Sequence, residues 1–457
     1  MMDTLPNSLA ARDVKYLLHP NTNARMHEQN GPMVISRGDG IHVYDDAGKE
    51  YIEALAGLWS VAVGFGEKRL VEAAQRQMST LPYYHIFSSK SHEPAIDLAE
   101  TLVKMTPEHL TRVFYTNSGS EANDTVVKMI WYYNNVLGRP EKKKIIARKN
   151  GYHGITVASA SLTGLPINHK DFDLPLPQMK HVTTPHFYRF GEEGETEEQF
   201  SDRLAQEIED MILAEGPETV AAFIGEPVIG AGGVLVPPKG YWEKVQRVLK
   251  KYDILLVADE VIMGFGRSGK TFACEYYGIK PDFLVLSKQI TSSYQPLAAI
   301  MLTDAIYQAI ADGSQKNGAF GHGYTASGHP VAMAVAIENL KIIEERGLVA
   351  NAEKVGAYMQ KRLREFADHP LVGEVRGVGL IAAVELVADK ATKAKFDPVG
   401  KAGAIYTRKS AENGLINRAI GDTICFCPPL IITEAQVDEM IARFSKSLDE
   451  TAAELKG

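Results

Sequence analysis

The chain has 457 residues, which is too long for one hydrophobic core, because single cores stop growing at roughly 250 to 300 residues. Its formal net charge is −8, its pI is near 5.9, and no long block of like charges occurs, so the composition does not indicate binding to nucleic acid or to an anionic membrane. We therefore expect two domains and small-molecule partners.

The N-terminus and the cysteines bear on compartment and metal binding. The first residues, MMDTLPNSLAARDVKYLLHP, lack the basic region and apolar stretch of a secretory signal, and no run of about 18 apolar residues occurs. We expect a cytoplasmic protein without membrane contact. Cys274, Cys425 and Cys427 are too few for a disulfide framework, and a lone C-x-C is weak evidence for zinc, so we expect structural thiols and no metal site.

The first two-thirds of the chain contains strand patterns of two kinds. Residues 40–62 alternate apolar and polar side chains around an Asp-Ala-Gly turn, which predicts a small hairpin belonging to the smaller domain. From about residue 95 to residue 305, short β-branched runs alternate with helical stretches, as in a largely parallel sheet. The expected strands lie in RVFYTNSG, KKKIIARKNGYHG, TVAAFIGEPVIG, ILLVADEV, FLVLSK and AAIMLT.

After His329-Pro330 the pattern changes. The amphipathic stretch VAMAVAIENLKIIEERGL predicts a long helix, and VGEVRGVGLIAAVELV, a further helical stretch and CFCPPLIIT predict an α+β region. We place the boundary at the long helix. The predicted division is an N-terminal segment of the small domain (1–65), a large cofactor domain (66–330) and a C-terminal small α+β domain (331–457).

Lys288 is the most informative residue, because it follows one apolar run (FLVLS) while Asp259 ends another (ILLVA). Burial disfavours an ammonium ion and frees the amine to condense with an aldehyde, whereas an ionised carboxylate nearby can keep a ring nitrogen protonated. Pyridoxal 5′-phosphate requires both groups. A lone lysine in this position is more often a snorkelling side chain, but the accompanying carboxylate favours the cofactor.

The sequence around this pair resembles the class III pyridoxal-phosphate aminotransferases of fold type I. The resemblance rests on Asp259-Glu260-Val261, the glycine-rich segment 264–269, Pro281-Asp282 and Ser287-Lys288. It implies an α/β fold, with a mainly parallel seven-stranded sheet between helices in the large domain and a smaller α+β domain from both chain ends. It also implies a homodimer with active sites at the interface, and a tetramer is left open.

The resemblance implies a ping-pong transamination. Lys288 would hold the cofactor covalently until an incoming amine displaces it, and would then move the proton between the substrate Cα and the cofactor C4′. Decarboxylases and mutases share this scaffold. A cofactor-carrying protein without turnover is a further alternative, against which the intact Lys288, Asp259 and Glu226 argue.

The segment 116–123 (TNSGSEAN) lies between a predicted strand and a predicted helix, where amides and hydroxyls can hold a phosphate. Taken alone, it is also an ordinary helix cap. The resemblance makes Gly119 and Ser120 the phosphate contacts. It also places Thr325 where the family sends a threonine across the dimer interface.

Further residues are expected around the cofactor ring. Tyr152, between glycines, would stack on one face and Val261 would press on the other. Asp259 would keep the ring nitrogen protonated. His153 is either a hydrogen-bonding partner behind this set or a structural histidine. Glu226, before a proline, lies near the cofactor O3′ by resemblance and is otherwise a solvated loop residue.

A rival prediction comes from GFGRSG (264–269), which fits the G-x-G-x-x-G pattern of dinucleotide-binding dehydrogenases. The following residues, KTFACEYYGIKPD, are too short and irregular for a phosphate-binding helix, and Asp282 comes too early for the acidic residue of that motif. A tight turn beside the cofactor pocket is the favoured interpretation.

Two positions narrow the substrate class. Many class III enzymes for ornithine or γ-aminobutyrate carry a glutamate at the position of Ala231, paired with an arginine that corresponds to Arg418. Arg418 therefore lacks that partner and is expected to bind a substrate carboxylate, although a surface salt bridge is its plainer interpretation.

Aromatic residues match the substrate-pocket walls of ω-amine:pyruvate aminotransferases in this family; they are Leu58-Trp59, Tyr83, Tyr84 and Phe87. Ordinary core packing is their alternative. We expect an (S)-selective ω-amine or ω-amino acid:pyruvate aminotransferase, with the substrate near Leu58, Trp59, Phe87, Tyr152, Ala231 and Arg418. A related enzyme using 2-oxoglutarate is the main alternative, and the sequence does not name the physiological amine.

Overall fold

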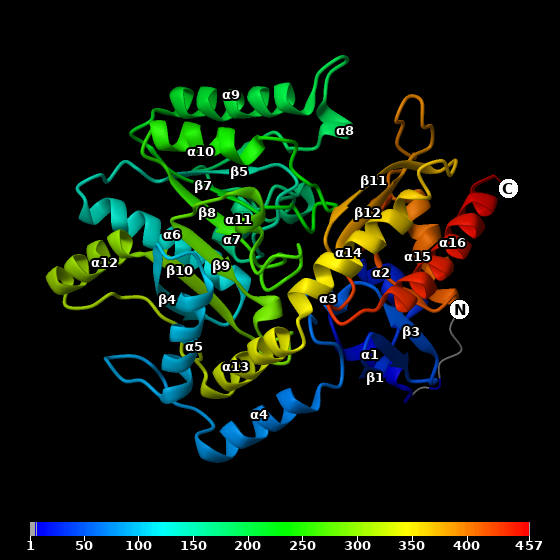
Figure 1. The fold of residues 1–457 in the computed structure, drawn as a ribbon, viewed down its shortest axis with the longest axis horizontal. Coiled ribbons are helices and arrows are strands. Elements are labelled where there is room, and N and C mark those ends of the chain that lie inside the picture. The colour runs from blue at the N-terminus through cyan, green and yellow to red at the C-terminus, as the bar shows by residue number, and fades with distance from the viewer. Residues whose placement is uncertain (1–4, 6, 457) are drawn as a thin grey trace.

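The computed structural model describes residue 5 and residues 7–456 of the chain. Over this part, the strands form one seven-stranded sheet and two four-stranded sheets (Figure 1). No helix of the described residues is both long and apolar enough to cross a membrane.

The large sheet has the order β4-β10-β9-β8-β7-β5-β6. Neighbouring strands from β9 to β6 run parallel, and β10 is antiparallel to both β9 and β4. The predicted mainly parallel seven-stranded sheet is therefore confirmed. The strands are β4 (Leu110–Thr116), β5 (Lys144–Arg148), β6 (Met179–Val182), β7 (Val220–Gly225), β8 (Leu255–Asp259), β9 (Phe283–Leu286) and β10 (Ala298–Thr303).

Helices cover both faces of this sheet, as the alternation along β9 shows. Leu284 and Leu286 lie in one apolar cluster with residues of α5 (Glu93–Met105) and α10 (Tyr241–Lys251). Phe283 and Val285 lie in another with residues of α6 (Gly119–Val136). Because both faces are buried, the strands are continuous apolar runs. The sequence predicted six of them for this reason and missed β6, in which Lys180 and His181 are only half-buried.

The small sheets join the two ends of the chain. The predicted hairpin is present as β2 (His42–Asp45) and β3 (Glu50–Glu53), with β1 (Ile35–Asp39) on one side and the C-terminal strand β13 (Leu415–Ile416) parallel to β3 on the other. The second small sheet is entirely C-terminal; its order is β11 (Val372–Val378), β12 (Ile381–Leu386), β15 (Thr423–Phe426) and β14 (Arg418–Ile420).

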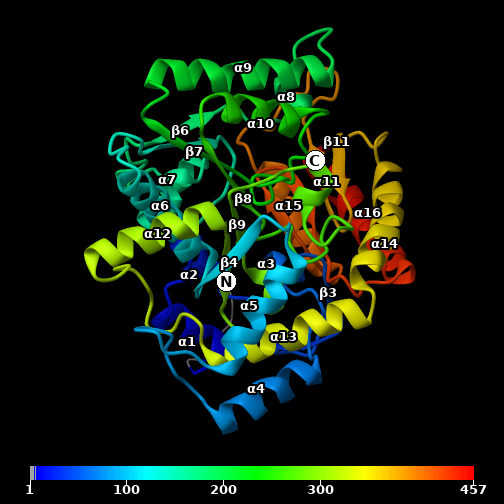
Figure 2. The same cartoon turned by 60° about the vertical axis from the view of Figure 1, so that its left-hand side comes forward.

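The predicted long helix is α13 (Pro330–Glu345), which packs on α4 (Lys68–Thr80) and α5, as Figure 2 shows. The domain boundaries near residues 65 and 330 stay a prediction. The remaining helices are α1 (Leu9–Tyr16), α2 (Ala24–Asn30), α3 (Ala56–Trp59), α7 (Val157–Leu162), η1 (Pro166–Asn168), α8 (Phe187–Phe190), α9 (Glu197–Glu215), α11 (Ala273–Tyr277), η2 (Lys288–Ile290), α12 (Asp304–Asn317), α14 (Leu348–Arg364), α15 (Lys401–Glu412) and α16 (Glu434–Lys456).

Candidate active site

Three predicted site residues lie at the carboxyl ends of adjacent parallel strands. Glu226 follows β7, Asp259 ends β8, and Lys288 comes two residues after β9. The strand register pairs Gly225 with Ala258 and Asp259 with Val285, so the three side chains start from one edge of the sheet. The carboxyl edge is where open α/β sheets bind their ligands.

Asp259 is buried within a network of donors. Its carboxylate accepts hydrogen bonds from Asn123 Nδ2 at 2.9 Å and from the Val261 amide at 3.1 Å, and it lies 2.8 Å from His153 Nδ1. Burial opposes ionisation, but the hydrogen bond and charge of His153, together with Asn123, hold the pKa of Asp259 below its ordinary value. The side chain is therefore a carboxylate at neutral pH.

Lys288 is half-buried and starts η2 with φ of +46°, in the left-handed region that non-glycine residues rarely adopt. Burial lowers the pKa of its amine, and the charges of Asp259 and Glu226 oppose that shift. Among the described residues, no acceptor lies within hydrogen-bonding distance of its Nζ. The amine is thus poised to react with an electrophile.

Glu226 is not the solvated loop residue that was its plain alternative, since only 4% of it is exposed. Its two carboxylate oxygens accept hydrogen bonds from the amides of Tyr152 and Gly230, each at 2.9 Å. Burial nevertheless raises its pKa. The residue ties the Tyr152 segment to the turn that carries Ala231.

The start of α6 offers free amides. Ser118 caps the helix by accepting a hydrogen bond from the Glu121 amide, so the ordinary capping role is present. Within residues 7–456, the amides of Gly119 and Ser120 donate to no acceptor. Beside them, a Cβ on Gly154 would lie 2.7 Å from Ser120 Oγ, so only glycine fits there. This combination suits an anion.

The expected substrate residues differ in exposure. Leu58 is 59% exposed and Phe87 is 42% exposed, as is expected of residues that face a pocket or a partner. Trp59 is buried in an apolar cluster with Val228 and Met263, so the alternative of core packing applies to at least part of its side chain. Its indole Nε1 nevertheless has no partner among the described residues.

Arg418, on β14, is half-buried and makes no ion pair with any described carboxylate. The plainer alternative of a surface salt bridge is thus not observed. Its charge opposes the rise in the pKa of Tyr152 and adds to the fall in the pKa of Lys288. The guanidinium therefore lies close enough to both residues for its charge to act on them. Ala231 lies in the turn held by Glu226.

Thr325 is an exposed residue in the loop before α13. Its carbonyl accepts a hydrogen bond from the Tyr83 hydroxyl at 2.6 Å, which connects this loop to the aromatic segment that contains Phe87. The contact of Thr325 with a second chain stays a prediction.

The dehydrogenase alternative fails at GFGRSG. The helix that follows, α11, has only five residues. Within the motif itself, the buried Arg267 donates hydrogen bonds to the carbonyls of Leu380 and Pro428. The glycines form a turn, as predicted, and they join β8 to the C-terminal region. They do not begin a phosphate-binding helix.

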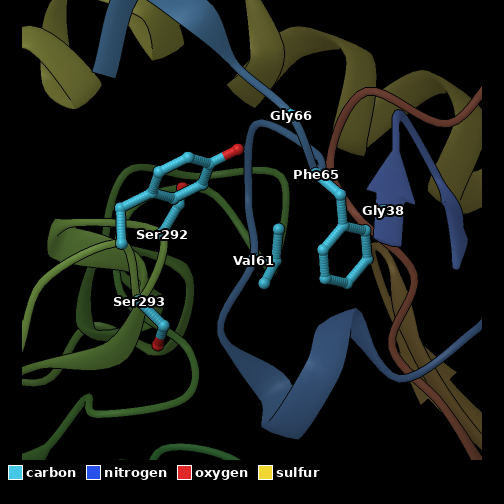
Figure 3. Close-up of a pocket in the computed structure, with 7 residues that line it drawn as sticks. Gly38, Val61, Phe65, Gly66, Ser292 and Ser293 are labelled. Atoms are coloured by element: carbon cyan, nitrogen blue, oxygen red, sulfur yellow. The ribbon is translucent and has the colours of Figure 1, made fainter. Parts of the chain in front are cut away.

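Two cavities lie outside these residues. One of about 300 Å³ is lined by Val61, Phe65 and the loop of Ser292 and Ser293, which follows Lys288 in sequence (Figure 3). The other, of about 470 Å³, is bordered by His186 and Arg376. Neither includes Lys288, Asp259 or Glu226.

Sequence reasoning assigned no role to Asn123, Glu53 or Arg376. Asn123 lies one helical turn after Gly119, so its spacing could have placed it on the same face of α6. Glu53 accepts a hydrogen bond from the Gly57 amide below the Leu58 segment. Arg376 donates to the carbonyls of Gly233 and Val234 and holds the turn after Ala231. The Arg376 contacts depend on the tertiary fold, whereas Glu53 and Gly57 are only four residues apart.

Comparison with known proteins agrees with this geometry. Residues 24–448 match the class-III aminotransferase family. The mitochondrial γ-aminobutyrate transaminase 1 of Solanum lycopersicum is 49% identical over 436 residues, which cover 95% of this chain and 85% of that protein. The diaminobutyrate–2-oxoglutarate transaminase of Halomonas elongata is 46% identical over 454 residues, covering 98% and 97%. The structure of the ω-transaminase from Pseudomonas jessenii in complex with PMP is 60% identical, with a TM-score of 0.97 and 98% of each chain covered.

The fold and the strand-end site define a pyridoxal-phosphate-dependent transferase of fold type I. The chain belongs to the class-III aminotransferase family. The predictions of fold, enzyme class and cofactor are confirmed. The acceptor stays a prediction, because the relatives are named for different substrates. The compartment also stays a prediction, because the Solanum lycopersicum relative is named as mitochondrial.

The described residues fit pyridoxal phosphate. Asp259 is held ionised, as a partner for a protonated ring nitrogen must be, and the Lys288 amine has a lowered pKa. The free amides of Gly119 and Ser120 suit its phosphate. One edge of the sheet thus provides the groups that each part of the cofactor requires.

Proposed function

We propose that the chain transfers an amino group from an ω-amino acid or a primary amine to pyruvate, by a ping-pong mechanism. The observation that carries this proposal is Arg418, a guanidinium without a carboxylate partner among the described residues, in the same site as Tyr152 and Lys288. With Ala231 in place of a pairing glutamate, the guanidinium is available for the carboxylate of a small keto acid.

Bound pyridoxal phosphate supplies an aldehyde carbon for covalent attachment and a ring that accepts electrons. Lys288 would hold the cofactor through that carbon, and once an incoming amine had freed it, its amine would carry the proton from and to the substrate Cα. Asp259 would keep the ring nitrogen protonated, and the contacts from His153 and Asn123 favour its ionised form. Glu226 fixes the Tyr152 amide, and through it the tyrosine that flanks the ring.

The phosphate and the ring faces complete the binding site. We assign the phosphate to Gly119 and Ser120, and we propose that Thr325 of a second copy adds a hydroxyl, so the active unit is a homodimer. Val261 would flank the ring on the face opposite Tyr152. A Cβ on Gly119 would lie 3.2 Å from the Val261 side chain, so the phosphate and ring contacts adjoin.

Arg418 also allows the site to accept two kinds of substrate. Its side chain binds the carboxylate of pyruvate in one half-reaction and moves aside in the other, where a carboxylate-free amine contacts the apolar side chains of Leu58, Trp59 and Phe87. The solved ω-transaminase at 60% identity supports this choice of substrate class. We take the (S) preference from the resemblance to that subgroup.

A second candidate function uses 2-oxoglutarate as acceptor, and the name of the Halomonas elongata relative favours it. The experiment uses the purified enzyme loaded with pyridoxal phosphate and each enantiomer of 1-phenylethylamine, without acceptor. We expect the (S) amine to bleach the visible absorbance band of the lysine-bound cofactor, and pyruvate to restore it at least about tenfold faster than 2-oxoglutarate. Equal or faster recovery with 2-oxoglutarate would overturn the assignment of pyruvate and support the second candidate.

A further inference from the structure

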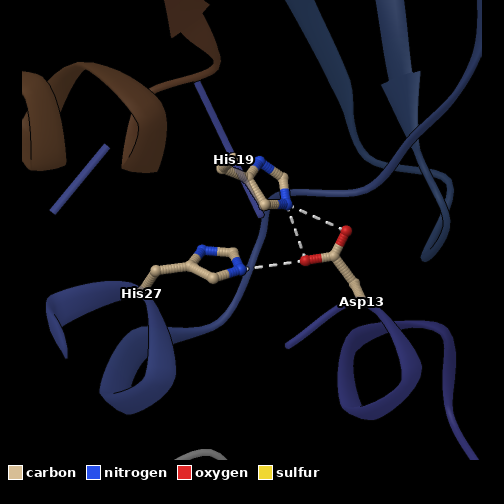
Figure 4. Close-up of side chains that lie close together, drawn as sticks. All are labelled: Asp13, His19 and His27. Carbon is tan, nitrogen blue, oxygen red and sulfur yellow. Dashed lines mark hydrogen bonds and ion pairs between the residues drawn. The ribbon is translucent and has the colours of Figure 1, made fainter. Parts of the chain in front are cut away.

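Three potential metal ligands converge in the N-terminal segment. Asp13 lies on α1, His19 in the turn that follows it, and His27 on α2. His19 Nε2 lies 2.8 Å from Asp13 Oδ2 and 3.0 Å from Oδ1, and His27 Nε2 lies 2.9 Å from the same Oδ2 (Figure 4). Both imidazoles therefore direct the same ring nitrogen at one carboxylate.

The spacing of these atoms is close to that of a metal site. The three ligand atoms lie within 4.8 Å of one another. A tetrahedral Zn²⁺ with bonds of about 2.0–2.2 Å holds its ligand atoms about 3.4 Å apart, so an opening of about half an ångström would admit the ion. The His19 and His27 side chains are 28% and 11% exposed, which leaves solvent access for an ion and its water.

The charge of the cluster also suits a divalent cation. The Asp13 carboxylate can supply a negative charge to the ion, and each neutral imidazole can supply a nitrogen lone pair. The other three-residue group of this kind, His186 with Glu374 and Glu385, already contains a cation. There Arg376 bonds to both glutamates at 2.5 and 2.6 Å. No arginine or lysine pairs with Asp13 among the described residues.

The surrounding helices have little apolar packing to fix their conformation. Helices α1 and α2 have eight and seven residues, and neither contains a buried residue. Helices this short are marginal in water without tertiary packing. A metal bond between them would provide a cross-link that an apolar core does not, as in small metal-stabilised domains.

We propose that Asp13, His19 and His27 bind one divalent transition-metal ion of the Zn²⁺ type per chain, with water completing the coordination. Imidazole ligands favour such an ion over Mg²⁺ or Ca²⁺. The site joins α1 to α2 and uses none of the residues assigned to the cofactor. The sequence-based expectation of no metal considered only the cysteines, because the D-x₅-H-x₇-H spacing has no familiar signature.

The test uses the full chain without an affinity tag, loaded with pyridoxal phosphate, freed of metal by a chelator and titrated with ZnCl₂ in a calorimeter. We expect one ion per chain, and at least about tenfold weaker binding in His19→Ala, His27→Ala and Asp13→Asn. His42→Ala removes a half-exposed histidine of β2 outside the cluster and is the matched control. It should bind as the wild type does.

Absence of stoichiometric zinc in the wild type would overturn the proposal, whatever the variants do. So would unchanged affinity in the Asp13→Asn variant, which keeps the shape of the side chain and covers the case in which a histidine variant does not fold. X-ray absorption on the zinc-loaded protein identifies the ligand atoms. Nitrogen and oxygen neighbours alone are expected, and sulfur neighbours would place the ion at a cysteine and contradict the assignment.

Discussion

The two ends of the proposed active site differ in how firmly the chain holds them. At the cofactor end, His153, Glu226 and Asp259 are at most 4% exposed and share a hydrogen-bonded network. At the substrate end, Leu58 and Phe87 are 59% and 42% exposed, and Arg418 has no ion-pair partner among the described residues. Groups with few internal contacts can change at little cost to stability, so substrate choice can diverge here while the chemistry is kept.

Lys288→Ala is expected to have the largest effect of any substitution at the cofactor end. We expect at least about a 10⁴-fold loss of transamination, because this side chain both attaches the cofactor and carries the proton. Borohydride reduction of the wild type should fix the cofactor covalently to the peptide containing Lys288, as mass spectrometry will show. Lys270→Ala, which removes an exposed lysine paired with Glu353, is the control. Fixation of the cofactor at another lysine would refute the assignment.

Asp259→Asn should lower the rate by about 10²–10³-fold, the usual cost of losing one preorganised electrostatic contact. The amide keeps the shape but cannot hold the ring nitrogen protonated, so the cofactor absorbance should also change. Glu260→Gln is the matched control. That neighbour accepts the Ala273 and Cys274 amides instead, and burial raises its pKa to about 7. A cofactor spectrum altered more by Glu260→Gln than by Asp259→Asn would count against the assignment.

Glu53→Gln tests whether a buried carboxyl group at the exposed substrate end makes the stability of the protein depend on pH. Burial raises the pKa of Glu53 to about 8, although the amides of Gly57 and Leu55 oppose that shift. An acid with a raised pKa binds a proton on folding, so its contribution makes the protein less stable as the pH rises from about 4.5 to about 8. The change amounts to ~3–5 kcal/mol.

The glutamine variant should lack that contribution. Denaturant unfolding at about pH 5 and about pH 9 should therefore show a smaller fall in the free energy of unfolding for Glu53→Gln than for the wild type. Glu50→Gln, at the exposed start of β3, is the control and should retain the wild-type fall. Equal falls in wild type and Glu53→Gln would show that Glu53 does not titrate in this range.

The same contrast explains what the sequence could predict. Lys288 and Asp259 follow apolar runs whose ends a parallel sheet brings together, so local pattern pointed to this pair, whereas Glu226 was assigned by the family resemblance. Asn123 and Asp259 are 136 residues apart and meet only because α6 packs beside the sheet, which no local pattern encodes. Glu53 was missed because its charge suggested a solvent-facing residue of a hairpin. In the structure it is 4% exposed, at the junction of two chain ends.

The most direct test of the proposed function is single-turnover kinetics of Arg418→Ala in each half-reaction. Our account predicts at least about a hundredfold slower reaction with pyruvate, because a bidentate charge-assisted contact is lost, and a rate within about threefold of wild type with (S)-1-phenylethylamine. Arg418→Lys keeps the charge without the planar fork, so its rate with pyruvate should lie between those of the wild type and Arg418→Ala. Equal losses in both half-reactions would contradict the account and leave Arg418 with a structural role.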